Sequence, residues 1–210
     1  ECNNPATCSA SNLMSVNGGT ATTIARNNNG SVTSFTPVNM TFDANGNAPF
    51  TFNYLDVGLA RLWASKPASG SLLSTLAGSS NAFVVRPGGF VLSTIRQTAA
   101  PQTVNPAAAN AGGGVFVKAG EPFSVTVTAT TTPASGATPT PNYGKETIPE
   151  SVKLTAALAP GLGLTNSPTI SATTGFASFT GGVATGTDFI WPEVGIITLT
   201  PSVGDADYLG

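Results

Sequence analysis

The chain has 210 residues, of which 40% are apolar and only 9% are charged, and its net charge is −2. This length fits one large domain or two ordinary ones, and the apolar fraction is sufficient for a core. The near-neutral charge and the lack of a basic stretch exclude the electrostatic footprint of a nucleic-acid-binding protein or of a segment that binds anionic membranes. The sequence contains no histidine, which excludes a Ser-His-Asp triad and histidine metal sites.

Cys2 and Cys8 are the only cysteines, and they lie close together at the start of the chain. Two thiols without a histidine do not complete a tetrahedral zinc site. We expect a small disulfide loop, which is typical of an oxidising compartment, with two free thiols on a flexible end as the alternative. Glu1 is not an initiator methionine, and no hydrophobic run is long enough to span a bilayer. We therefore expect an internal or processed fragment of a longer protein.

Short alternating runs bounded by Gly, Pro and Asn predict β-strands along most of the chain. Residues 38–42 and 50–54 alternate on either side of an Asn-Gly pair, which supplies a turn with positive φ and predicts a hairpin. Residues 123–129 alternate between apolar and hydroxyl side chains, which predicts a strand with one buried and one solvated face. Residues 150–159 fit a short helix or a strand, and the surrounding runs favour a strand.

Two distant segments, residues 52–62 and 189–199, share one spaced pattern of side chains. Each has a phenylalanine, a second aromatic residue, a carboxylate, a Val-Gly pair and then a leucine. The motif residues are Phe52, Tyr54, Asp56 and Gly58 in the first copy, and Phe189, Trp191, Glu193 and Gly195 in the second. A pattern that recurs in kind and spacing indicates two copies of one structural unit.

Every position of the motif has a structural role available. In an immunoglobulin-like sandwich, an aromatic residue near a corner anchors a late strand, so we expect Tyr54 and Trp191 to be anchors. The phenylalanine two residues earlier is expected to pack inward, and the carboxylate to accept backbone N–H groups in the turn. We therefore predict an all-β chain of two tandem immunoglobulin-like β-sandwich domains, residues 1–82 and 83–210, with an incomplete first sandwich as an alternative.

The sequence offers few groups for catalysis or for metal binding. None of the ten aspartates and glutamates stands in an aromatic-lined context that would mark a pair of catalytic carboxylates, so we predict a protein that is not an enzyme and has no cofactor. Asp205 and Asp207 are the candidate ligands of a calcium ion, since extracellular modules bind this ion weakly through oxygen atoms. Residues 43–47 also present alternating oxygen atoms, although a hairpin turn explains that segment.

Exposed aromatic side chains stack on sugar faces in carbohydrate-binding modules. The candidates here are Trp63, Tyr143 and Tyr208. For Trp63, burial in the core or between the domains is the expected alternative.

Several short motifs occur in a fixed order along the chain. They are the cysteine pair, residues 48–58, 83–87, 119–123 and 140–144, and the second motif followed by residues 207–210. This ordered set, which spans most of the chain, resembles the MshQ-like proteins, large bacterial surface or secreted proteins linked to the mannose-sensitive haemagglutinin type IV pilus locus. The resemblance implies β-rich, immunoglobulin-like modules outside the cell and a role in adhesion or pilus function. It supplies no catalytic mechanism.

We therefore expect a non-enzymatic structural and adhesive module of a pilus-associated or cell-surface bacterial protein, located outside the cell. Its expected partners are neighbouring domains of the same longer chain, with pilus components, glycans or copies of itself as further options, and loops such as residues 131–143 would face a partner. Weak surface charge and exposed strand edges also fit a self-assembling subunit of an extracellular fibre or surface layer. A carbohydrate-binding module of a larger secreted protein is the third hypothesis.

Overall fold

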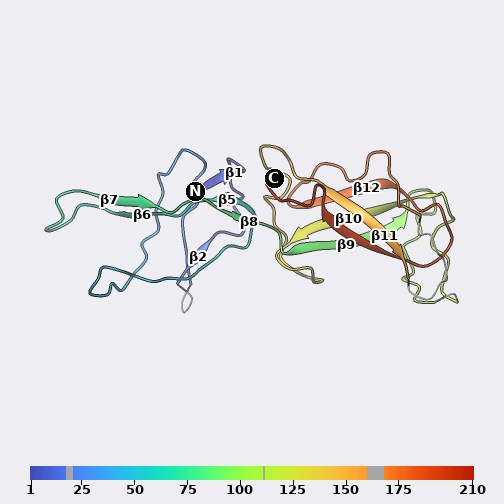
Figure 1. Cartoon of the computed structure of the whole chain (residues 1–210), viewed down its shortest axis with the longest axis horizontal. Coiled ribbons are helices and arrows are strands. Elements are labelled where there is room, and N and C mark those ends of the chain that lie inside the picture. The colour runs from blue at the N-terminus through green and yellow to red at the C-terminus, as the bar shows by residue number, and fades with distance from the viewer. Residues whose placement is uncertain (18–20, 111, 160–167) are drawn as a thin grey trace.

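The computed structural model describes residues 1–17, 21–110, 112–159 and 168–210, and these residues form β-strands joined by turns and loops. The all-β prediction is confirmed. No helix occurs among the described residues, and therefore none that is long and apolar enough to cross a membrane. Figure 1 shows two halves that follow one another along the long axis, with the C-terminus close to the region where they meet.

The first half contains short strands. They are β1 (Cys2–Asn4), β2 (Ser15–Val16), β3 (Thr22–Thr23), β4 (Phe52–Asn53), β5 (Gly58–Ala60), β6 (Trp63–Lys66), β7 (Leu76–Ser79) and β8 (Phe83–Val85). These strands form three small sheets with the orders β1-β5-β8, β3-β2-β4 and β6-β7. The β6–β7 hairpin extends away from the second half (Figure 1).

The second half contains longer strands. They are β9 (Gly89–Gln97), β10 (Pro122–Thr130), β11 (Val152–Leu158), β12 (Val183–Ile190) and β13 (Ile197–Val203). One antiparallel sheet has the order β12-β10-β9, and β11 and β13 form the other. Alternate residues of β10, such as Val125 and Val127, are fully buried and pack with β11 and β12 in two hydrophobic clusters between the sheets. The predicted strands at residues 123–129 and 150–159 are therefore confirmed.

Strand β8 belongs to the sheet of the first half, although we expected the domain boundary between residues 82 and 83. Its residues pair with β5, from Phe83 opposite Ala60 to Val85 opposite Gly58. The next sheet begins with β9 at Gly89. Strand pairing thus places the change of sheet between Val85 and Gly89.

The predicted hairpin of the first half forms only its turn. The amide of Asp43 donates to the carbonyl of Asn47 at 2.8 Å, and Asp43 Oδ1 accepts the amide of Asn47 at 2.8 Å. Residues 38–42 form no strand, however, and β4 pairs with β2 instead. The hairpin prediction is wrong because these hydrogen bonds close only the turn, and β4 pairs with β2.

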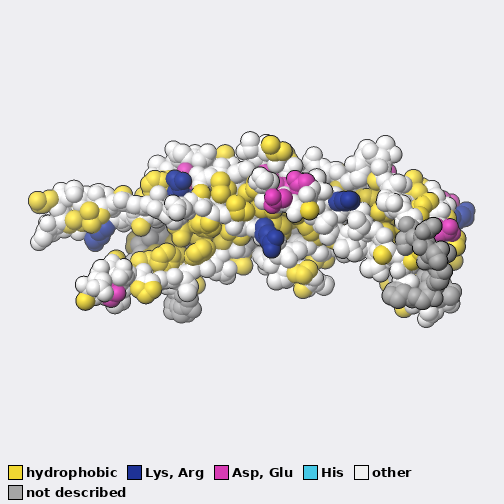
Figure 2. Space-filling view, viewed as in Figure 1, with side chains coloured by type: hydrophobic (Ala, Val, Ile, Leu, Met, Phe, Trp, Pro, Cys, Tyr) yellow, Lys and Arg dark blue, Asp and Glu magenta, His cyan; other side chains and the backbone are white. Residues whose placement is uncertain are grey.

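The first half has little core of its own. The prediction that Phe52 packs inward is wrong, because its side chain is 47% exposed. Its ring lies 5.4 Å, between centroids, from that of Phe83 in the neighbouring sheet. Other large apolar side chains on the same half are also exposed, namely Phe35, Met40, Phe42 and Phe50. Figure 2 shows hydrophobic side chains gathered on the visible face of this half. Among the described residues, both hydrophobic clusters lie in the second half, and Val57 is their single member from the first.

Candidate functional site at the joint between the halves

Val57 of the first half lies inside the hydrophobic core of the second half. Its side chain is 1% exposed. It packs in one cluster with Val127, Ala129, Tyr143, Val152, Phe179, Ala184 and Tyr208. Burying a valine side chain stabilises a fold by roughly 1.5–3 kcal/mol, so the two halves share part of one core.

Asp56 and Asn142 form a buried hydrogen-bond network beside Val57. Asp56 is 2% exposed, and its Oδ1 accepts the amides of Val57 and Asn142, both at 2.9 Å. The side chain of Asn142 donates through Nδ2 to the Val57 carbonyl at 3.3 Å and to the Tyr54 hydroxyl at 3.1 Å. Its Oδ1 accepts the amide of Ser9 at 2.8 Å. Both ends of the Asn142 amide group are therefore bonded to the first half.

Two further segments of the first half also bond to the second. Asn12 Nδ2 donates to the carbonyl of Pro139 at 2.7 Å and to that of Leu55 at 2.9 Å. The amide of Thr147 donates to Asn4 Oδ1 at 2.8 Å. Hydrogen bonds from several separate segments restrict both rotation and bending at the joint.

Burial in the joint changes the acidity of Asp56 and Tyr54. Desolvation raises the pKa of the Asp56 carboxyl to about 6, although the amides of Asn142 and Val57 act in the opposite direction. Burial, with the Asp56 charge as a smaller cause, raises the pKa of Tyr54 to about 12. Asp56 Oδ2 has no hydrogen-bond partner within the described part of the chain. A perturbed carboxyl is a candidate for catalysis, but this one is enclosed by both halves and out of reach of a substrate.

Two tyrosines that we considered as sugar-stacking residues lie in the core instead. Tyr143 is 0% exposed, and its ring stacks on that of Tyr208 at 5.9 Å between centroids, with an interplanar angle of 16°. The Tyr208 hydroxyl donates to Glu146 Oε1 at 2.8 Å. The sugar-stacking prediction is wrong for both residues because they fill the core that Val57 enters. The end of the loop at residues 131–143 is likewise buried in the joint.

Trp63 differs from its expected position in the opposite direction, since it is exposed and not buried. We expected burial, but the side chain is exposed in β6, and its Nε1 donates to Glu1 Oε2 at 2.7 Å. The β6–β7 hairpin carries the indole away from both clusters, so no core is available to bury it.

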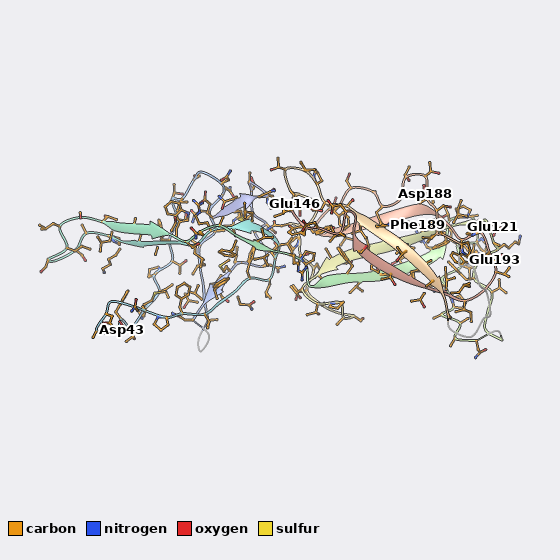
Figure 3. All side chains as sticks on the ribbon, in the orientation of Figure 1. Asp43, Glu121, Glu146, Asp188, Phe189 and Glu193 are labelled. Atoms are coloured by element: carbon orange, nitrogen blue, oxygen red, sulfur yellow. A yellow bond between two sulfur atoms is a disulfide. The ribbon has the colours of Figure 1, made fainter. Side chains whose placement is uncertain are left out.

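The turn of the first motif is repeated in the second. Glu193 Oε1 accepts the amide of Val194 at 2.8 Å, as Asp56 Oδ1 accepts that of Val57. The following glycines have φ values of 130° and 139°, a region that favours glycine because it has no Cβ. Phe189 and Trp191 are buried in the second cluster, so this copy packs inward where Phe52 does not. Figure 3 shows Glu146 near the joint and Glu193 at the far end of the second half.

The remaining candidate residues serve local structure. Cys2 and Cys8 are joined by a disulfide with 5.7 Å between their Cα atoms, which confirms the predicted pair. Asp205 and Asp207 are exposed, and Asp205 Oδ1 accepts the Asp207 amide at 3.1 Å. In the described ranges, no group of three or more His, Cys, Asp or Glu side chains is placed to hold a metal ion. Calcium at this pair stays a prediction.

Comparison with known proteins assigns both halves to one family. The model of the first Ig-like domain of DUF6701, a domain of unknown function, matches residues 1–79, and that of the second DUF6701 domain matches residues 86–188. The chain belongs to the DUF6701 family. The expected immunoglobulin-like region is confirmed, and the joint links the first and second DUF6701 domains. No curated protein and no solved structure matches the chain.

Proposed function

We propose that this DUF6701 chain is a non-enzymatic structural and adhesive module of a bacterial surface protein, as its resemblance to the MshQ-like proteins implies. The observation that carries the proposal is the burial of Val57 and Asp56 in the second domain. Domains in one chain move relative to each other unless a sizeable apolar interface joins them. A joint with a shared core keeps two sandwiches in line, and a stiff, elongated pair holds a distal segment away from the cell.

The chemistry of the acidic residues supports a structural role. Nine of the ten accept a backbone amide, namely Glu1, Asp43, Asp56, Glu121, Glu146, Glu150, Asp188, Glu193 and Asp205. The disulfide between Cys2 and Cys8 fits a location outside the cell, where such bonds persist.

The location and the adhesive role are tested together on the producing bacterium. An antibody against residues 1–210 should label intact cells, at pilus tips or scattered over the envelope, in immunogold electron microscopy. Deleting the coding region should reduce adhesion of the cells to surfaces, and restoring it should recover adhesion. Label that requires permeabilised cells, or adhesion that is unchanged by the deletion, would contradict the proposal.

The exposed apolar face of the first domain favours a second candidate, a self-assembling subunit of a fibre or surface layer. Phe42 and Phe52 are among its exposed side chains. Figure 2 shows hydrophobic side chains gathered on this half, and contiguous apolar patches mark interaction surfaces. Light scattering coupled to size exclusion should then give a mass well above that of a monomer. The double variant Phe42→Ser and Phe52→Ser should reduce that mass, and a wild-type chain that stays monomeric at high concentration excludes this candidate.

A further inference from the structure

The two motif turns have the same geometry but opposite surroundings. We call residues 56–58 the first corner and residues 193–195 the second corner. The first corner is buried against the second domain, with Val57 at 1% exposure, whereas Val194 at the same position of the second corner is 70% exposed. The local hydrogen bond and the glycine φ are nevertheless retained. The second corner therefore has the form of a docking turn, and Glu193 places it at the end of the second domain that is far from the joint (Figure 3).

The strands that follow the two corners also differ in one respect. In the first domain, β5 has a partner on each edge, β1 on one side and β8 on the other. In the second domain, β13 pairs with β11, and within the described part of the chain no strand pairs with its other edge. An unpaired edge is a template for the addition of another strand.

The registers show that the open edge of β13 corresponds to the β8 edge of β5. Alternate residues of an antiparallel strand direct their N–H and C=O groups to opposite edges. In the first domain, Arg61 donates to the Glu1 carbonyl on the β1 side, at 2.9 Å, so Ala60 faces β8. In the second domain, the Ile196 carbonyl accepts the amide of Ala159 on the β11 side, at 2.8 Å. Counted from the corner glycines, the matching positions on the open edge are residues 197 and 199.

Strand β8 connects the two kinds of contact. It completes the edge of β5 and continues through residues 86–88 into β9, the first strand of the domain whose core receives Val57. The same segment therefore pairs with the edge of β5 and leads directly into the second domain, which buries Val57. Pro201 lies further along the open edge of β13 and has no N–H group to donate. An added strand can therefore pair with the part of β13 that lies next to the second corner.

We propose that the second corner and the open edge of β13 dock a third β-sandwich module, carried on the same polypeptide behind Gly210, as the first corner and β5 dock the second domain. The leading strand of that module pairs with Ile197, and its core takes the Val194 side chain into an apolar slot of the kind that Tyr143 and Phe179 line for Val57. The inference concerns the order of modules along the chain. It is independent of adhesion.

The experiment places a second copy of the second domain behind the second corner, because the core of this domain is already seen to receive a corner valine, Val57. The test chain consists of residues 1–210 followed directly by a second copy of residues 76–210. With the copied Val85 opposite Gly195, as Val85 lies opposite Gly58, the copied β7–β8 segment is long enough to run along β13. Val194→Cys is introduced into the original 210-residue chain. In the test chain, it is introduced only at residue 194 of the leading 1–210 part. Maleimide labelling is followed without reductant, so that the Cys2–Cys8 disulfide remains closed.

We expect Cys labelling at position 194 to slow at least about ten-fold in the extended chain. Ile148→Cys is the matched control, because the Ile148 side chain is 84% exposed and should label equally fast in both chains. Equal rates at position 194 would overturn the proposal, and so would slower labelling at both positions, which would indicate general occlusion. Hydrogen exchange of the Ile197 and Leu199 backbone amides tests strand pairing without any substitution. This exchange should slow at least about ten-fold in the extended chain. Unchanged exchange would overturn the proposed strand pairing.

Discussion

Replacing Val57 by alanine should destabilise the second domain, although residue 57 belongs to the first. The substitution removes two methyl groups from a side chain that is 1% exposed, which costs about 1.6 kcal/mol at about 0.8 kcal/mol for each group. The space that remains among the surrounding side chains adds on the order of 1 kcal/mol. The expected loss is therefore about 2–3 kcal/mol, or about 4–12 °C in Tm for a chain of this size.

The assay is urea unfolding followed by tryptophan fluorescence. Trp191 is buried in the second domain and Trp63 is exposed in the first, so the signal change reports mainly on the second domain. Val194→Ala is the matched control, because it makes the same change at the same motif position on a side chain that is largely exposed. Its effect should stay within about 0.5 kcal/mol.

The comparison of these two variants decides whether the joint contributes to the core. A loss below about 0.5 kcal/mol for Val57→Ala would show that the second domain is complete without the first. Equal losses for both valines would show that the motif stabilises each corner by itself, without docking.

Three other changes follow from the same geometry. Because burial raises the pKa of Asp56 from 3.8 to about 6, the folded chain holds that proton more tightly, and wild-type stability should fall by up to about 3 kcal/mol as the pH rises from about 4 to 6. Asp56→Asn should lack this fall in denaturation curves between pH 4 and 7, and parallel pH profiles would contradict the assignment. Tyr208→Phe should lower the free energy of unfolding in urea by about 1–3 kcal/mol, because it leaves a buried Glu146 oxygen without its donor. An unchanged urea midpoint would argue against that hydrogen bond. Gly58→Ala should lower the free energy of unfolding by about 2–4 kcal/mol, because the new Cβ would overlap a carbonyl of β1. Gly46→Ala, with open space around it, should lower it by about 1 kcal/mol. Similar losses in thermal melts would refute the close contact between Gly58 and β1.

Local sequence patterns predicted the features that depend on neighbouring residues. The alternation at residues 123–129 matches the burial pattern of β10 except at Ser124, which is buried. Both motif carboxylates accept the amide that follows them. The fold class follows from such short-range signals, because strand alternation and turn residues act over a few positions.

The surroundings of the motif could not be predicted in this way. Val57 and Val194 occupy the same position of one pattern, and what separates them is a contact with residues far away in the sequence. In the sequence, Asn142 was visible only as part of the motif at residues 140–144, although it bonds to the first domain through its side-chain amide and its backbone N–H. Tyr143 was expected at the surface because it follows a loop rich in Thr and Pro. Its ring packs against Phe90, Phe179 and Tyr208, which are distant in the sequence, so no local pattern encodes its burial.

The shared core also sets the order in which the chain gains structure. The hydrogen bond between Asp56 and Asn142 joins residues 86 positions apart, and contacts of such long range form slowly because a long loop must close first. The short strands of the first domain bury few apolar side chains before this contact exists. During synthesis, the first domain therefore gains these contacts only after residue Asn142 has been made.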